Sequence, residues 1–200
     1  MKNQDYLYLD HAASTPMRKS AMDKYIEAES YGYANSSGGH KLSRNSKNLL
    51  EDSREKIAEL LNAAQGEIVF TSGGTEADNW TIKSLFNSER PNDNLVTSNI
   101  EHEAVIASAE WVSSNGFHTK YAKSDKNGLV TKDEFLGQVD NDTKVASLMW
   151  GNNETGIIQP IKDIAREIKT INSSTLFHSD VVQGIISDNI DFHKNGIESA

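Results

Sequence analysis

The stretch Val145-Ala146-Ser147-Leu148-Met149-Trp150 is rich in large apolar residues and predicts a buried β-strand. A helix is predicted next, because Pro160 suits the first turn of a helix and the apolar residues after it recur at helical spacing. Those residues are Ile161, Ile164, Ala165, Ile168 and Ile171. Residues 175–178 then predict a second apolar strand. A strand, a helix and another strand in succession are typical of an α/β fold.

The same alternation extends toward the N-terminus. Three further short strands are predicted at residues 68–70, 95–97 and 117–121. Helices are predicted at residues 17–30, 49–61, 76–86 and 104–113, and at a capping box that begins at Thr131. Residues 31–46, rich in Gly, Ser and Asn, predict a long loop. These elements predict an α/β fold with a mostly parallel central sheet and helices on both faces.

The composition excludes several classes of protein. Among 200 residues, 20 are Lys or Arg and 29 are Asp or Glu, so the formal net charge is −9. That balance argues against nucleic acid and membrane surfaces as partners, because both attract basic faces. There is no cysteine, which excludes disulfides, thiolate metal sites and a cysteine nucleophile within these residues. Short apolar runs and a polar N-terminus predict a soluble, cytoplasmic protein without a membrane span or signal peptide.

Ligands of parallel α/β sheets bind where the strands end, so the residues after each predicted strand are candidates for a site. After residues 68–70 comes a turn of small hydroxyl and glycine residues, 71–75, and then a helix. Glycines expose backbone N–H groups and a helix N-terminus carries partial positive charge, which together suit a phosphate group. An ordinary turn in which Thr75 caps the helix is the alternative.

His102 follows the strand at residues 95–97 and immediately precedes a helix. Its imidazole could stack on a ligand or exchange protons near neutral pH, or it could cap the helix or lie on the surface. No two of the six histidines have the spacing of a metal site, so no metal is predicted.

Two more strand ends carry polar groups. Asn152 and Asn153 follow residues 145–150, where they either form a plain turn or donate hydrogen bonds to a ligand oxygen. Asp180 follows residues 175–178, and a carboxylate beside an apolar strand needs a partner, either a backbone N–H or a cationic ligand. Together, the strand ends suit one anionic, heteroaromatic ligand.

Six segments of the chain resemble the cysteine desulfurase family, which belongs to the class-V aminotransferases, pyridoxal-phosphate enzymes of fold type I. The segments are YLDHAASTP (8–16), NSS (35–37) with His40, TSGGTEADN (71–79), EHEAV (101–105), NNETG (152–156) and HSDVVQ (178–183). They follow the family's order and spacing over essentially the whole chain. The resemblance implies the large domain of a fold-type-I enzyme, with pyridoxal 5'-phosphate as its cofactor.

The resemblance also implies a role for each matched position. Gly74 and Thr75 are similar to the family's phosphate cradle. His102 is similar to the catalytic histidine that stacks on the pyridine ring and moves protons. Asp180 is similar to the aspartate that pairs with the pyridinium nitrogen and keeps the ring an electron sink.

Asn153 and Gln183 are similar to residues beside the ring hydroxyl oxygen, and Ala12 and Ala13 to small residues near the substrate. The family has Asn-Pro-Ser-Ser before its histidine, whereas this chain lacks that proline before His40 and has two glycines there, so no site role is assigned to His40.

The family's Schiff-base lysine lies in a Ser-x-His-Lys segment, which family spacing places within roughly ten residues after Ala200. Lys194 follows Asp180 too soon and is predicted to be a solvated loop lysine. The chain is therefore expected to be an N-terminal half that lacks that lysine and the sulfur-accepting cysteine, and to be inactive alone. Residues 1–15 are expected to form an arm that packs on a small domain, and residues 16–200 an incomplete large domain.

By this resemblance the complete protein is expected to take sulfur from L-cysteine, giving alanine and an enzyme persulfide for iron–sulfur cluster assembly or thiolation. It is expected to be a homodimer that passes sulfur to an acceptor or scaffold protein. A selenocysteine lyase and another class-V aminotransferase remain alternatives. A non-catalytic half that binds a phosphate ligand or a protein partner is a more distant one.

Overall fold

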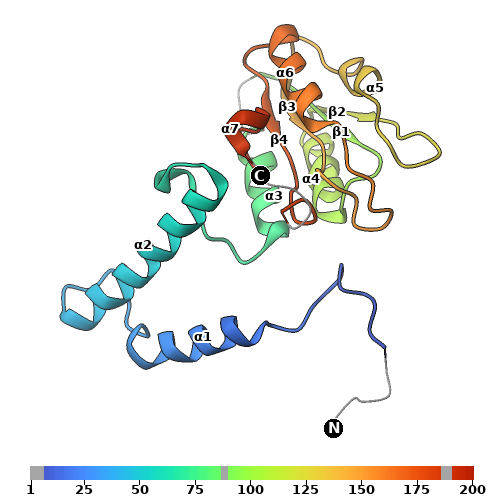
Figure 1. Cartoon of the computed structure of the whole chain (residues 1–200). Coiled ribbons are helices and arrows are strands. Elements are labelled where there is room, and N and C mark those ends of the chain that lie inside the picture. The colour runs from blue at the N-terminus through green and yellow to red at the C-terminus, as the bar shows by residue number, and fades with distance from the viewer. Residues whose placement is uncertain (1–6, 87–89, 186–190) are drawn as a thin grey trace. The chain divides into compact units, whose positions relative to one another are not determined.

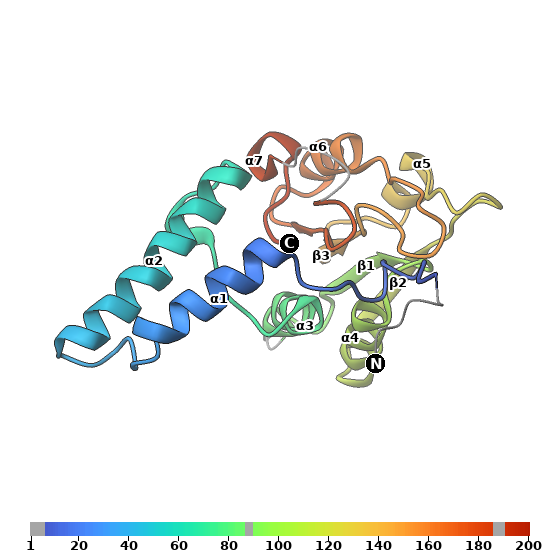
Figure 2. The ribbon, with the colours of Figure 1, turned by 60° about the horizontal axis from the view of Figure 1, so that its bottom comes forward.

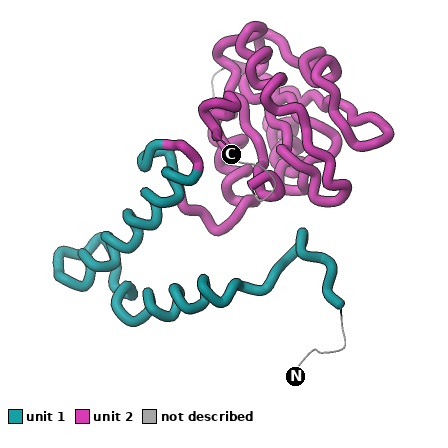
Figure 3. The backbone as a smooth tube through the Cα atoms, viewed as in Figure 1, with its two compact units in different colours: residues 1–60, 64–68 teal, residues 61–63, 69–200 magenta. Residues whose placement is uncertain are grey.

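The structure is a computed structural model that describes residues 7–86, 90–185 and 191–200 (Figure 1). Its contacts divide the chain into two compact units (Figure 3). Unit 1 comprises residues 1–60 and 64–68, and unit 2 comprises residues 61–63 and 69–200. The division predicted from sequence, between residues 15 and 16, stays a prediction.

Unit 2 contains a four-stranded sheet in the order β2-β1-β3-β4. The strands are β1 (Asn94–Ser98), β2 (His118–Ala122), β3 (Thr143–Ser147) and β4 (Leu176–His178). All three strand pairs are parallel, as in the register that places Leu95 beside Thr119 on one side and Val145 on the other. The chain runs outward from β1 to β2, and β3 then lies on the opposite side of β1. This reversal makes the C-terminal ends of β1 and β3 a topological switch point, where α/β sheets bind ligands.

Helices cover both faces of this sheet, as Figure 2 shows. On one face, α3 (Gly74–Ser84) and α4 (Glu103–Ser114) contribute Ile82, Val105, Ala109 and Val112 to a cluster that also contains Leu95 and Val145. On the other face, α5 (Lys132–Leu136) and α6 (Ile161–Ile171) pack their apolar residues on Val96, Ala146 and Phe177. Adjacent residues of one strand thus belong to opposite clusters, because side chains alternate across a strand. The predicted α/β fold with a parallel sheet is confirmed.

Several predicted elements differ from the structure. Residues 68–70 do not form a strand: Val69 and Phe70 are 57% and 45% exposed, and they pair with no strand of the described residues. Three consecutive apolar residues fit a strand pattern, but a strand also needs a neighbour to pair with. Residues 41–46, predicted as loop, are helical, and a four-residue helix, α7 (Phe192–Asn195), was not predicted.

Unit 1 contains two helices, α1 (Lys19–Tyr31) and α2 (Lys41–Leu61), and a 3₁₀ turn at Gln65–Glu67. The two helices approach closely at Gly32, where an added Cβ would lie 2.8 Å from Leu49 Cδ2. The long helix α2 is polar on most of its surface, and no helix of the described residues is long and apolar enough to cross a membrane.

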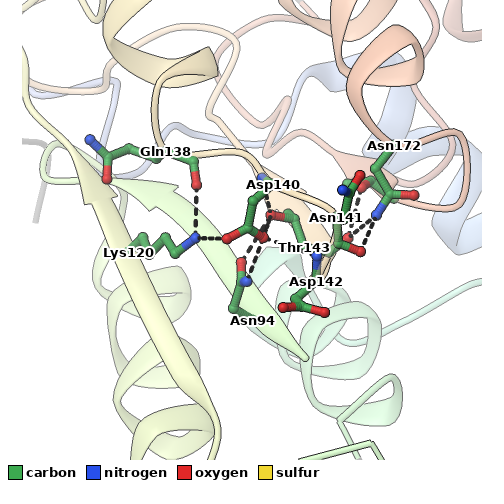
Figure 4. Close-up of polar contacts among 9 residues, drawn as sticks. Asn94, Lys120, Gln138, Asp140, Asn141, Asp142, Thr143 and Asn172 are labelled. Atoms are coloured by element: carbon green, nitrogen blue, oxygen red, sulfur yellow. Dashed lines mark hydrogen bonds and ion pairs between the residues drawn. The ribbon is translucent and has the colours of Figure 1, made fainter. Parts of the chain in front are cut away.

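A polar cluster joins the N-terminal ends of the strands, at the edge of the sheet opposite the switch point (Figure 4). Asp140 accepts hydrogen bonds from Asn94 Nδ2 (2.9 Å) and Thr143 Oγ1 (3.1 Å) and pairs with Lys120 Nζ at 2.5 Å. Partial burial raises the pKa of Asp140, but the hydrogen bonds from Lys120, Asn94 and Thr143 outweigh it and lower the pKa to about 2. One carboxylate therefore connects β1, β2 and β3.

Candidate functional site

A pocket of about 150 Å³ lies where β1, β3 and β4 end and α3 begins. All six residues predicted to hold a ligand line it: Gly74, Thr75, His102, Asn153, Asp180 and Gln183. The other lining residues are Asp78, Met149, Gly151 and Val182. The sheet brings these side chains together because parallel strands end at one edge. The pocket belongs entirely to unit 2.

The N-terminus of α3 forms one wall of the pocket. Gly73 is the N-cap, and its φ of 155° is a conformation that L side chains rarely adopt. No side chain caps the helix, so the alternative in which Thr75 is the cap is wrong. An added Cβ at Gly74 would lie 2.9 Å from Val182 Cγ2, so only glycine leaves this wall open. Among the described residues nothing accepts the N–H groups of Gly74 and Thr75, and such groups at a helix N-terminus favour an anion.

Two of the predicted hydrogen-bond donors in this turn, the N–H and the hydroxyl of Ser72, are already used within the chain. Glu76 accepts the Ser72 N–H and hydroxyl, both at 2.6 Å. These two bonds lower the pKa of Glu76 and keep it ionised, so the Ser72 groups are already satisfied within the chain.

His102 lies in the turn after β1 and has two functions there. Its Nδ1 accepts the Ala104 N–H at 3.1 Å and so caps α4, while the residue also lines the pocket. The capping interpretation is therefore confirmed, and the ligand-facing one stays a prediction. Because Nδ1 is an acceptor in this bond, Nε2 is the nitrogen left to exchange protons.

The two asparagines in the turn after β3 differ: Asn152 holds the turn together, and Asn153 lines the pocket. Asn152 is buried, donates to Ile100 O and accepts from the Glu154 and Thr155 N–H groups, so it forms the predicted turn. Asn153 lines the pocket, and no side-chain hydrogen bond of Asn153 is found among the described residues. The turn interpretation is therefore confirmed for Asn152, and hydrogen bonding of Asn153 to a ligand stays a prediction.

Asp180 follows β4 and is 7% exposed. Its Oδ1 accepts the Val182 N–H at 2.9 Å, and no hydrogen bond from the described residues reaches Oδ2. Burial raises the pKa of Asp180, against the Val182 bond and the nearby His178 and His102, which lower it. A cationic donor at Oδ2 would therefore be bound strongly.

A second buried carboxyl, Glu101, lies directly behind the pocket and was not predicted. Its two oxygens lie 3.1 and 3.0 Å from the Met149 nitrogen, and Ser98 donates its hydroxyl to Oε1. Burial raises the pKa of Glu101 to about 8, and the charges of Asp180 and Asp78 add to that rise, while the Ser98 and Met149 hydrogen bonds oppose it.

Asp78 was also missed, although its position one turn after Gly74 on α3 could have indicated it. It is 3% exposed, and its Oδ1 lies 3.4 Å from His178 Nε2, close enough for an ion pair but without hydrogen-bond geometry. His178 Nδ1 contacts Ser147 Oγ at 2.8 Å. The pocket thus has two carboxyl groups in its lining, Asp78 and Asp180, and a third, Glu101, that contacts the lining residue Met149.

Four other residues considered from sequence are not among the pocket residues. His40 lies in unit 1, where its Nδ1 accepts the Ser43 N–H at 3.3 Å at the start of α2. Ala12 and Ala13 also belong to unit 1, so their expected nearness to a substrate stays a prediction. Lys194 is exposed on α7 rather than in a loop, and it is not among the pocket residues.

The arrangement suits a small molecule that is anionic at one end and cationic at the other. The α3 N-terminus provides N–H donors for an anion, and Asp180 provides a carboxylate for a cation. His102 and Asn153 line the space between with an imidazole and an amide. Such a ligand would be oriented by its two ends.

Comparisons with known proteins agree with this geometry. The pattern of the class-V aminotransferases matches residues 7–199. Cysteine desulfurase IscS of Methanosarcina thermophila is 38% identical over 193 residues, which are 96% of this chain and 47% of that protein. Putative cysteine desulfurase IscS 1 of Bacillus subtilis is 36% identical over 88% of this chain and 46% of its own length. The chain spans about half the length of the curated relatives it matches.

Two solved structures have a backbone similar to that of this chain. A NifS-like protein superposes with a TM-score of 0.92 at 34% identity, over 96% of this chain and 53% of its own. SspA in complex with cysteine superposes with a TM-score of 0.89 at 32% identity, over 96% of this chain and 55% of its own.

Proposed function

Because this chain belongs to the class-V aminotransferase family, we propose that its pocket binds pyridoxal 5'-phosphate and serves a cysteine desulfurase. The observation that carries the proposal is the convergence of six residues from four separate chain segments on one pocket at the switch point of the sheet. Each of the six has a chemical group that matches one part of this cofactor.

The residues present fit the cofactor at both of its charged ends. Asp180 is buried and has an oxygen without a protein hydrogen bond, which suits the N–H of a pyridinium ring. Gly74 and Thr75 begin α3, and their N–H groups, which have no acceptor in the part of the chain that the structure describes, suit the phosphate. In the described residues no Lys or Arg lines the pocket, so phosphate binding depends on these neutral donors and on the helix N-terminus.

The remaining residues would orient the ring and move protons. Asn153 and Gln183 would lie beside the ring hydroxyl, and His102 would cover the ring face. When bound, the cofactor supplies an electron sink for negative charge that develops on the substrate. His102 would hold a proton at Nε2 and donate it from there, because its Nδ1 accepts the Ala104 N–H.

The proposed substrate is L-cysteine, which the related SspA binds in its solved structure. Removal of its sulfur would leave alanine, and a cysteine thiol would accept the sulfur as a persulfide. We place this reaction in a cytoplasmic homodimer that passes sulfur to an acceptor or scaffold protein for iron–sulfur cluster assembly or thiolation.

Calorimetric titration with pyridoxine 5'-phosphate tests the proposal, because this analogue has the ring and phosphate but no aldehyde to react with surface lysines. We expect saturable binding of one molecule per chain. Asp180→Asn should weaken it at least about tenfold, since a charge-assisted hydrogen bond contributes about 1.5–3 kcal/mol.

Asp163→Asn is the matched control, because Asp163 is exposed on α6 and pairs with Arg166. It should leave the affinity unchanged. Absence of saturable binding, or equal loss in both variants, would refute the proposed cofactor site.

A further inference from the structure

The proposed function gives no role to Asp78, although this residue lines the pocket. Asp78 lies one turn after Gly74 on α3, so the two residues share one face of the helix. Helical side chains lean toward the N-terminus, which directs the Asp78 carboxyl toward the first turn, where the phosphate is proposed to bind. An ionised carboxyl at that position opposes the binding of an anion.

The contact that the structure gives to the Asp78 carboxyl comes from His178. Nε2 of His178 lies 3.4 Å from Asp78 Oδ1, and among the described residues the Asp78 carboxyl accepts no hydrogen bond. No Lys or Arg of the described residues lines the pocket. Within the part of the chain that the structure describes, His178 is therefore the one basic side chain at ion-pair distance from Asp78.

The sheet fixes the position of the His178 ring. His178 is the last residue of β4, is 0% exposed, and pairs in register with Ser147, the last residue of β3. Its Nδ1 lies 2.8 Å from Ser147 Oγ. Because a hydroxyl can donate to Nδ1 whereas a carboxylate can only accept, this arrangement directs an Nε2–H group toward Asp78.

The other ionisable groups around this pair come from two turns. Asp180 follows β4, and Glu101 and His102 lie in the turn after β1. Burial and then the charge of Asp78 raise the pKa of Asp180, and the imidazoles of His178 and His102 lower it. In this group of residues the two imidazoles are therefore the basic side chains that balance the carboxyls.

We propose that His178 is a positioning residue that compensates the charge of Asp78, so that the N-terminus of α3 can bind an anion. The ring holds the Asp78 carboxyl on the side of the sheet and reduces the negative charge that this carboxyl presents to the pocket. The identity of the anion, the phosphate of pyridoxal 5'-phosphate, rests on the proposed function. The pairing of His178 with Asp78 is a property of the protein alone.

Nuclear magnetic resonance of the ligand-free chain, labelled with ¹⁵N at histidine, tests the pairing. His178 is the one buried residue among the six histidines, all of which the structure describes, so its ring N–H should exchange slowly with solvent. The proton should lie on Nε2, and the Nε2 signal should shift in Asp78→Asn. His118→Gln, which changes an exposed histidine, should leave that signal in place. A proton on Nδ1 alone, or an unchanged Nε2 signal in Asp78→Asn, would overturn the inference.

Calorimetric titration with pyridoxine 5'-phosphate tests the effect on the anion. In His178→Asn the shorter amide can replace Nδ1 beside Ser147 but cannot reach Asp78. This change should weaken binding at least about fivefold in the wild-type background and less than about twofold in Asp78→Asn, because the two residues are coupled. His178→Gln keeps an N–H donor near the Nε2 position and should retain more of the affinity than His178→Asn.

An equal loss of affinity in both backgrounds would show that His178 acts only through the stability of the fold, and would overturn the inference. If His178→Asn does not fold, the resonance comparison of the wild type with Asp78→Asn decides. Failure of the wild-type chain to bind pyridoxine 5'-phosphate would refute the cofactor site, and inorganic phosphate would then be the anion for the same variants. The expected pattern with inorganic phosphate would support the inference without that cofactor, whereas binding of neither anion would overturn both proposals.

Discussion

Asp180 and Glu101 are both buried carboxyls, but only one could be predicted from the sequence. Asp180 follows a short apolar strand, and that position alone indicates that its charge needs a partner. Glu101 lies in a polar turn between a strand and a helix, where no periodicity indicates burial. Its burial depends on the segment that follows β3, which supplies the Met149 N–H from 48 residues away.

The raised pKa of Glu101 predicts a pH dependence of stability. The carboxyl binds a proton more tightly when folded (pKa about 8) than at its ordinary value of 4.5. The folded state therefore holds more protons between these values, and the free energy of unfolding should fall as pH rises from about 4.5 to about 8. Urea unfolding at a series of pH values should show a smaller fall in Glu101→Gln than in the wild type.

Glu103→Gln is the control for this prediction, because Glu103 is an exposed glutamate two residues away. Its pH profile should match that of the wild type. Identical slopes in the wild type and Glu101→Gln would show that Glu101 is ionised throughout this range.

At the scale of elements, the spacing of apolar residues predicted the helices better than the strands. The helix α6 was predicted because its apolar residues recur over three turns, and Ile161, Ile164 and Ile168 are indeed buried. Residues 68–70 formed too short a run to distinguish a strand from exposed extended chain. Strand order was also beyond prediction, since it depends on pairings between distant segments such as β1 and β3.

The polar cluster around Asp140 predicts how the stability of the fold decreases at acid pH. The pKa of Asp140, lowered to about 2 from 3.8, means that its ionised form stabilises the fold. This contribution is present above pH 4 and should be lost as pH falls toward 2. Thermal unfolding followed by circular dichroism should show a shallower acid decline in Asp140→Asn than in the wild type.

Asp142→Asn is the comparison here, since Asp142 is exposed and lies two residues from Asp140. The decrease in stability at acid pH should be the same in Asp142→Asn as in the wild type. A wild-type decline that Asp140→Asn leaves unchanged would assign acid sensitivity to other carboxyls.

At the scale of the whole molecule, the pocket depends on unit 2 alone. Both hydrophobic clusters, β1–β4 and all pocket residues belong to it. The rule that ligands bind at strand ends indicated the segments that hold His102, Asn153 and Asp180, and the role of Gln183 came from the family resemblance. The turn at residues 71–75 was chosen because it follows residues 68–70, which do not form a strand. The boundary between the two units near residue 68 was not predicted, since no Pro- or Gly-rich linker precedes residue 69.

A shortened chain of residues 61–200 should therefore fold and retain the pocket. We expect cooperative urea unfolding and an affinity for pyridoxine 5'-phosphate within about threefold of the full chain, a difference of less than 1 kcal/mol. A non-cooperative transition in the shortened chain would show that unit 2 depends on unit 1 for its stability.

The measurement that tests the central claim most directly is nuclear magnetic resonance of the ¹⁵N-labelled chain during titration with pyridoxine 5'-phosphate. The account predicts saturable shifts at the backbone amides of Gly74, Thr75 and Val182, which surround the pocket. Amides at the opposite end of the sheet, such as Asp142 and Lys144, should not move. Shifts confined to that opposite end, or no saturable shift at Gly74 and Thr75, would contradict the proposed cofactor site.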